Sequence, residues 1–218
     1  VDIRRLAEEF RSKYERLDVL VNNAGAYFNQ RKLSVDGFEM TFALNHLGYF
    51  YLTYVLLDMI KSSAPARIVN VSSGAHAMGK IKFDNLNSEG LYLGWTAYGT
   101  SKLMNILFTR ELSRRLEGSL VTANVLHPGF VATNFGHNGK GIWPLFVKWS
   151  QKRALSPEQG AQTSIYLASS PEVIGVSGAY FYDRKIVQPS KAAQDDEIAR
   201  RLWDISLELV GENEKVAI

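Results

Sequence analysis

Cysteine is absent from the 218-residue chain. Disulfide bonds and thiolate catalysis are therefore excluded, and the composition is compatible with a reducing compartment. Histidine is scarce as well, with four residues, and none has partners at the spacing of metal ligands. We therefore expect no metal site. A cytoplasmic location is expected by default, with a membrane anchor in an N-terminal piece outside this sequence as the alternative.

Long apolar runs are also lacking. The one stretch of membrane length, 42–60, carries Asn45, His46 and Asp58. Such polar groups favour a buried core helix over a membrane span. The first residues form an amphipathic pattern without the apolar segment of a signal peptide. We expect no membrane span in this chain.

Charge of one sign is not concentrated anywhere. Lys and Arg number 25 against 22 Asp and Glu, which gives a net charge of +3. The densest basic runs, 148–153 and 200–201, are short and lie among residues of helical pattern. A solvated helix face is the better interpretation of both, and a nucleic-acid partner is not expected.

Short apolar runs alternate with helical patterns along the whole chain. Hydrophobic residues make up 46% and charged residues 22% of the sequence, as in a soluble domain with a sizeable core. Continuous apolar runs are typical of parallel strands buried on both faces. We therefore expect one α/β domain, 1–218, with a doubly wound parallel sheet. The expected strands are 17–21, 67–71, 120–126 and 179–182, and the expected helices are 1–14, 36–60, 98–118, 195–210 and one that begins after Ser156.

Two helix starts have local signatures. Asp36 followed by Glu39 resembles a capping box, which places the start of the second helix at Asp36. Ser156 followed by Pro157 places an N-cap and a first-turn proline at the start of a later helix.

Tyr98 and Lys102 lie four positions apart in a stretch that predicts a helix ending near Gly118. Positions i and i+4 share a helix face, so the phenol and the ammonium can reach one pocket. A cation beside a phenol favours the phenolate, and we expect the pKa of Tyr98 to move down toward neutral pH. An ordinary solvent-exposed helix face would show the same spacing. The neighbouring motifs therefore decide whether Tyr98 and Lys102 form a functional pair.

Small and polar residues follow three of the expected strands, at 22–25, 72–74 and 128–133. Parallel sheets bind ligands beyond the carboxyl ends of their strands. Strand-to-helix turns use the same residue types, but three clusters at one edge, together with Tyr98 and Lys102, predict a ligand site.

These motifs, in this order, resemble the short-chain dehydrogenase/reductase family. They are Asn22-Asn23-Ala24-Gly25, Asn45, Ser73, Tyr98-x-x-x-Lys102 and Pro128-Gly129. The sequence Ser-Gly-Ala-His after the second strand, the long insert before Tyr98 and His127-Pro128-Gly129 resemble the retinol dehydrogenase-like branch. The resemblance implies a Rossmann-like fold and an oxidoreductase that moves hydride between NAD or NADP and an apolar alcohol, aldehyde or ketone.

The resemblance also implies roles for individual residues. Tyr98 would be the acid/base, Lys102 would lower its pKa and bind the nicotinamide ribose, and Ser73 would orient the substrate oxygen. Asn45 would hold a water that connects Lys102 to solvent. Cofactor contacts, besides those of Asn45, Tyr98 and Lys102, would come from Asn22, Ala24, Gly25, Pro128, Gly129, Val131 and Thr133.

One part of the family pattern is lacking. The family begins with a strand and a turn of the form G-x-x-x-G-x-G, whereas this sequence opens on a helical pattern and contains no such turn. The cluster Gly136-x-x-Gly139-x-Gly141 does not follow a strand, so we do not expect it to bind a pyrophosphate. We expect that the N-terminal strands of the family lie outside this sequence and that the run 17–21 is an exposed apolar edge. The choice between NAD and NADP stays open.

Several alternatives remain at this level. A non-catalytic fragment that serves as a dimerisation or binding module is the main alternative to an enzyme, and a reductase of the protochlorophyllide or steroid type is a minor one. The aromatic segment 135–149 forms either a lid over an apolar substrate or ordinary core. His46, His76 and His127 are expected to be structural. By resemblance, helices 36–60 and 98–118 would pair two copies in a homodimer or homotetramer.

Overall fold

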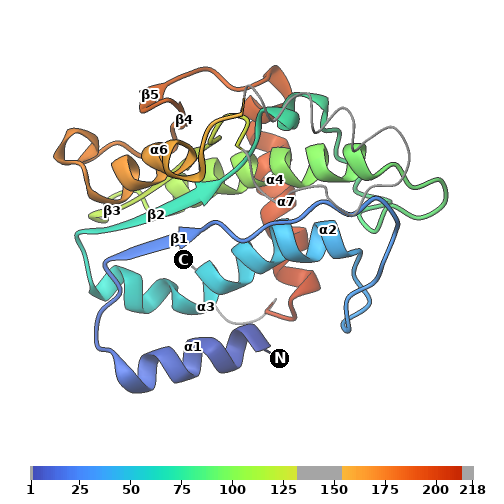
Figure 1. Cartoon of the computed structure of the whole chain (residues 1–218). Helices are drawn as coiled ribbons and strands as arrows, with labels where there is room; N and C mark the ends of the chain where they lie inside the picture. The colour runs from blue at the N-terminus through green and yellow to red at the C-terminus, as the bar shows by residue number, and fades with distance from the viewer. Residues whose placement is uncertain (1, 132–153, 213–218) are drawn as a thin grey trace.

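The computed structural model describes residues 2–131 and 154–212. Its five strands are adjacent in space in the order in which they occur in the chain, and the first four are parallel (Figure 1). The last strand turns back and pairs antiparallel with the fourth. The strands are β1 (Val19–Asn22), β2 (Ala66–Val71), β3 (Val121–Leu126), β4 (Tyr180–Tyr182) and β5 (Lys185–Ile186).

Helices cover both faces of this sheet, as expected for a doubly wound α/β fold. Figure 1 shows α6 above the strands and α3 and α1 below them. The helices are α1 (Asp2–Lys13), α2 (Met40–Phe42), α3 (Gly48–Ser62), α4 (Gly94–Arg115), α6 (Pro157–Ser169) and α7 (Asp196–Leu209). A π-helical turn η1 (Ala43–Leu47) joins α2 to α3, and the short 3-10 helices are η2 (Gly74–Met78), η3 (Pro171–Val173) and η4 (Lys191–Gln194).

The strand β2 shows why the apolar runs are continuous. Ile68 packs into a core with α3, α4 and α7, whereas Val69 packs on the opposite face with Leu167 of α6. Successive side chains of a strand point to opposite faces, so a strand covered on both sides is apolar at every position. At the edge, β1 pairs only with β2 among the described strands, and Val21 is 42% exposed, which confirms the exposed apolar edge.

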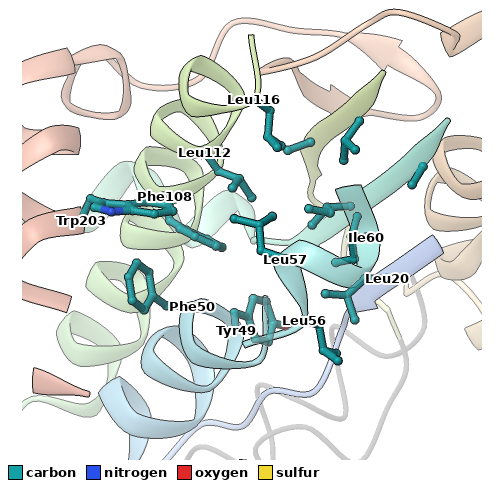
Figure 2. Close-up of a cluster of buried hydrophobic side chains, with 14 of the residues drawn as sticks. Leu20, Tyr49, Phe50, Leu56, Leu57, Ile60, Phe108, Leu112, Leu116 and Trp203 are labelled. Carbon is teal, nitrogen blue, oxygen red and sulfur yellow. The ribbon is translucent and has the colours of Figure 1, made fainter. Parts of the chain in front are cut away.

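The larger core is aromatic at its centre. Figure 2 shows Phe50, Phe108 and Trp203 facing one another from α3, α4 and α7. The Trp203 ring lies 5.0 Å from Phe50, edge to face, and 5.9 Å from Phe108, close to parallel. This cluster joins the three helices beneath the sheet.

The helix expected from Asp36 begins later, at Met40. Gly37 adopts φ +83°, so 34–37 form a turn in which the Gly37 N–H donates to the Ser34 carbonyl. Glu39 is then the N-cap, and its carboxylate accepts hydrogen bonds from the backbone N–H groups of Thr41 and Phe42. A carboxylate at a helix N-terminus is favourable, which makes Glu39 the cap and not the third residue of a capping box. The other expected start is confirmed: Ser156 caps α6 in a capping box with Gln159.

The helix α4 lies almost entirely inside the molecule. Every residue from Ser101 to Thr109 is buried, and α7 and η4 of the same chain pack against it. Much of the surface expected to pair two copies of the chain is therefore covered within one copy. The homodimer or homotetramer stays a prediction, and the surface through which the copies would pair is not defined. Within 2–131 and 154–212, each helix is either too short or too polar to cross a lipid bilayer.

His46 in η1 is fully buried. We expect it to make the free energy of unfolding depend on pH. Its Nε2 lies 3.1 Å from the Ser206 hydroxyl, which itself donates to the Leu202 carbonyl. Nε2 therefore carries the proton and donates to Ser206, while Nδ1 has no hydrogen-bond partner among the described residues. Burial lowers the pKa of His46 to about 4, against an opposing effect of the Asn105 side chain.

Because this pKa is lower in the folded chain than the unfolded value of about 6.5, the unfolded chain binds the proton first as the pH falls. The stabilisation is fully present above about pH 6.5 and is lost between there and about pH 4. We expect His46 to contribute a loss of about 2–3 kcal/mol between pH 7 and pH 4.5. Urea unfolding at both pH values measures it. His46→Gln keeps a donor for Ser206 without titrating, and an equal loss in this variant would contradict the assignment.

Candidate active site

The predicted polar clusters meet at one edge of the sheet. β1 ends at Asn22, β2 at Val71 and β3 at Leu126, and the three strands are parallel neighbours. The segments that follow them therefore leave the sheet on the same side. Ser73 lies directly after β2, and α4 brings Tyr98 and Lys102 to this edge.

A close contact between two glycines places Ser73 beside the helix that carries Tyr98. A Cβ atom at Gly99 of α4 would lie 2.7 Å from the Ala75 carbonyl oxygen, and one at Gly79 would lie 2.6 Å from the Gly99 carbonyl oxygen. Any larger side chain at either position would separate the backbones of η2 and α4. Ser73, which caps η2, is held against α4 in this way.

Tyr98 is 8% exposed, and its phenol interacts with the Ser73 side chain. Burial raises the pKa of Tyr98 to about 12, while the interaction with Ser73 acts in the opposite direction. The expected downward shift of this pKa is therefore wrong for the protein alone. Burying a charged phenolate costs more free energy than the interaction with Ser73 provides. The phenol therefore keeps its proton at neutral pH.

Lys102 is a buried cation with unused hydrogen-bond donors. Its ammonium donates to the Val71 carbonyl oxygen at 3.1 Å, and it lies 5.5 Å from the centre of the Tyr49 ring and 5.7 Å from that of Tyr98. Burial lowers the pKa of Lys102 to about 8, so the charged form still predominates at pH 7. An ammonium has three N–H groups, and the described residues accept only one of them.

Asn45 is fully buried in η1 and holds the segment after β1 in place. Its Oδ1 accepts from the Ala26 N–H at 2.9 Å, and its Nδ2 donates to the Ala26 carbonyl at 3.0 Å and to the Ser101 hydroxyl at 3.1 Å. These bonds use both N–H groups of the amide and one of the two acceptor positions of Oδ1, and through them Asn45 positions Ala26 and Ser101. A water held by Asn45 stays a prediction.

Gly25 lies where Asn45 and Lys102 approach each other. A Cβ atom at Gly25 would lie 3.2 Å from the Asn45 Oδ1 and 3.2 Å from the Lys102 Nζ. A side chain here would press on both groups, which explains the glycine in the motif. Gly25 thus lies beside the Lys102 ammonium, and cofactor contacts from Ala24 and Gly25 stay a prediction.

The Asn22 side chain points into the core. Its Nδ2 donates to the Thr53 hydroxyl at 2.9 Å and to the Asn70 Oδ1 at 2.8 Å, and Asn70 in turn donates to Thr109. Asn22 is 4% exposed. A cofactor contact from Asn22 stays a prediction for its backbone, because its side-chain amide is occupied inside the protein.

The loop after β3 carries the remaining predicted cofactor residues. Gly129, after Pro128, has φ +84°, a conformation that other residues adopt at a cost. A Cβ atom there would also lie 2.9 Å from Leu155. Val131 bridges Leu155 in parallel and packs against Gly160 of α6. Thr133, the aromatic segment 135–149 and the glycines from 136 to 141 lie outside the described residues.

An aromatic group surrounds Tyr98, which the sequence pattern did not single out. The Trp95 ring lies 5.8 Å from that of Tyr98 and 4.8 Å from that of Tyr27, and the Tyr27 ring lies 6.4 Å from Tyr98. Trp95 lies three positions before Tyr98 on one helix, so its spacing was a usable signal. Tyr27 comes from a distant segment and had none.

Other residues near the site are structural. The Ser72 hydroxyl donates to the Lys102 carbonyl at 2.7 Å and connects β2 to α4. His127 stacks on Tyr182 at 4.2 Å. In the part of the chain that the structure describes, no three His, Asp or Glu side chains come together as metal ligands would.

Comparisons with known proteins agree with this geometry. The family model described as short chain dehydrogenase matches residues 1–140. Human retinol dehydrogenase 14 is 54% identical over 214 residues, which cover 96% of this chain and 63% of that protein. Human retinol dehydrogenase 13 is 48% identical, with 96% and 65% covered. The chain thus spans about two thirds of the length of these relatives.

Solved structures show the same fold. An uncharacterised protein of Mycobacterium paratuberculosis superposes with a TM-score of 0.75 at 34% identity, covering 96% of this chain and 71% of that one. The Pseudomonas aeruginosa RhlG/NADP active-site complex superposes with a TM-score of 0.63 at 28% identity, covering 82% and 69%. With the family model matching well over half of its length and Ser73, Tyr98 and Lys102 gathered at one sheet edge, this chain belongs to the short-chain dehydrogenase family.

Proposed function

We propose that the protein is an NAD(P)-dependent oxidoreductase that moves hydride between a nicotinamide cofactor and an alcohol or carbonyl group. The observation that carries this proposal is the contact of a protonated, buried Tyr98 with Ser73, one helical turn from a buried Lys102 with unused donors. A proton donor, a hydroxyl to orient an oxygen and a cation are the groups that such a reaction requires.

The residues present fit a nicotinamide cofactor. Lys102 offers two N–H donors to ribose hydroxyls beside Gly25, where a larger side chain would obstruct the approach. Gly129, in the loop that follows β3 at this edge, adopts a positive φ. The bound nicotinamide supplies or takes the hydride. The RhlG neighbour is an NADP complex, and the choice between NAD and NADP remains open for this chain.

Tyr98 is the proposed donor of the proton that the substrate oxygen receives. Because its pKa is raised to about 12, the phenol is protonated at neutral pH and donates to the oxygen of a carbonyl substrate as that oxygen gains charge. The Ser73 hydroxyl oxygen accepts from the Ala75 N–H, and the Ser73 proton, which interacts with Tyr98 in the protein alone, turns to the same substrate oxygen when substrate binds. Alcohol oxidation requires the reverse transfer, in which the Tyr98 phenolate accepts the proton of the alcohol while Ser73 stays hydrogen-bonded to the same oxygen.

The surroundings of Tyr98 favour an apolar substrate. Tyr27 and Trp95 present aromatic surface beside the phenol, and aromatic side chains bury large apolar areas. Relatives that share about half of the sequence are named retinol dehydrogenases. We propose an apolar alcohol or aldehyde, of which a retinoid is one example, as the substrate class.

A fluorescence titration tests the cofactor site. The 218-residue chain contains four tryptophans, and Trp95 lies beside Tyr98 while Trp203 lies in the core. Titration with NADPH and with NADH should quench fluorescence saturably at micromolar concentrations. In Trp95→Phe the saturable change should shrink, whereas in Trp203→Phe it should persist. Lys102→Met should weaken binding at least about tenfold, because it removes a buried charged donor.

The outcome also decides between the enzyme and its main alternative. A folded chain that binds neither nucleotide would contradict a complete cofactor site in these 218 residues. It would favour a binding or dimerisation role for this chain, and activity would then be sought in a longer form of the protein.

A further inference from the structure

His76 is a buried histidine that the proposed reaction does not use. It lies in η2, three residues after Ser73, and is 6% exposed. Both of its ring nitrogens are within hydrogen-bond distance of partners, of which Ser73 is local while Tyr180 and Ser190 come from distant parts of the chain. This arrangement differs from that of His46, whose Nδ1 has no hydrogen-bond partner among the described residues.

The Ser73 carbonyl oxygen receives two hydrogen bonds from the same residue. The backbone N–H of His76 donates to it at 3.0 Å, and the ring Nδ1 lies 2.8 Å from it. Two donors on one carbonyl restrict rotation of the peptide that follows Ser73. The Ser73 hydroxyl, which contacts the Ala75 N–H and Tyr98, is carried by that restricted backbone.

The other ring nitrogen identifies the tautomer. The backbone N–H of Ser190 points to His76 Nε2 at 3.1 Å. A backbone N–H can only donate, so Nε2 must accept and carries no proton. In the neutral ring the proton then lies on Nδ1, where the Ser73 carbonyl accepts it and the Tyr180 hydroxyl oxygen lies at 3.3 Å.

We propose that His76 is a positioning residue for Ser73, held in its Nδ1–H tautomer by the backbone of Ser190. The ring thereby connects the segment between β5 and η4 to the serine beside Tyr98. Burial lowers the pKa of His76, which agrees with a neutral ring. The effect on catalysis rests on the proposed function above, whereas the tautomer and its contacts do not.

The tautomer can be measured without turnover. In the ¹⁵N-labelled 218-residue chain, a long-range ¹H–¹⁵N correlation spectrum at pH 7 separates protonated from bare ring nitrogens. Comparison with His76→Asn identifies the signals of His76 among the four histidines. We expect a protonated Nδ1 and a bare Nε2. A ring protonated at Nε2, or at both nitrogens, would overturn the proposal.

Two variants separate the contacts of the ring. His76→Asn places an amide N–H near the position of Nδ1 and keeps the donor to Ser73. His76→Gln is one methylene longer, reaches toward the position of Nε2 and keeps an acceptor for Ser190. Turnover is compared in the protein with any sequence that naturally flanks this chain, and thermal unfolding confirms that both variants fold.

In His76→Gln we expect kcat to fall about tenfold to a hundredfold, because small misplacements of reacting groups have effects of this size. In His76→Asn we expect kcat within about threefold of the wild type, and in both variants KM for the cofactor should change little. Equal losses in the two variants, or unchanged turnover in His76→Gln, would overturn the positioning role. A wild-type protein without turnover would contradict the proposed function, and the tautomer measurement would still decide the His76 contacts.

Discussion

Replacing Tyr98 with Phe should reduce kcat about a thousandfold while leaving cofactor affinity within about threefold. The phenol is the protonated group next to Ser73, and proton transfer by a positioned acid contributes about 10²–10⁴-fold to rate. The ring itself remains and keeps its contacts with Trp95 and Tyr27. Steady-state kinetics and nucleotide titration, in the protein with any naturally flanking sequence, measure the two quantities separately.

A matched control comes from another tyrosine of the core. The Tyr54 hydroxyl has no hydrogen-bond partner among the described residues, and its ring stacks on Phe50 at 6.2 Å. Tyr54→Phe removes the same atom away from the sheet edge and should leave turnover within about twofold. If Tyr98→Phe retained a tenth of the wild-type turnover, Tyr98 could not be the acid.

Replacing Trp203 with Ala should destabilise the chain by about 3–5 kcal/mol, the range for buried aromatic residues. The side chain is 2% exposed and fills the space between α3, α4 and α7. The Arg115 guanidinium also lies 4.5 Å from the ring centre, and that contact would be lost. A loss of this size is a large part of the stability of an ordinary domain. Urea unfolding followed by circular dichroism measures it.

Trp203→Phe provides the comparison. The indole Nε1 has no partner among the described residues, so its removal relieves an unpaired buried donor. Phe should therefore cost much less than Ala, about 1–2 kcal/mol, through lost volume alone. Ile165→Ala on α6, where the side chain is 54% exposed, should change stability by less than about 1 kcal/mol. A Trp203→Ala loss as small as that of Ile165→Ala would contradict the packing in Figure 2.

Local patterns predicted the elements and the edge at which the site lies. The apolar runs became parallel strands, and Tyr98 and Lys102 lie on one helix at the expected edge. Spacing alone could not predict the sign of the pKa shift of Tyr98. That sign depends on how much water the fold removes, and burial here outweighs the opposing effect of Ser73 on the pKa of Tyr98.

Long-range contacts account for most of the remaining differences. His76 and Ser190 are 114 positions apart, and neither segment contains a sequence pattern that predicts their contact. The orientation of Asn22 likewise becomes clear only from the burial pattern of β1. Asn22 lies two residues after the buried Leu20, with the exposed Val21 between them. The alternation of a strand therefore turns the Asn22 side chain inward, which argues against a side-chain cofactor contact.

The amides of Asn22 and Asn70 also affect how reliably the chain folds. These two residues face each other across β1 and β2, in strands whose other residues are apolar except Arg67. A slip of two residues would keep apolar contacts but separate the two amides, leaving buried polar groups unpaired at about 1–3 kcal/mol each. The amides add little net stability to the correct alignment and penalise the incorrect ones. The Asn22–Asn70 pair therefore selects the correct register of β1 and β2, next to the edge where Lys102 and Gly25 lie close together.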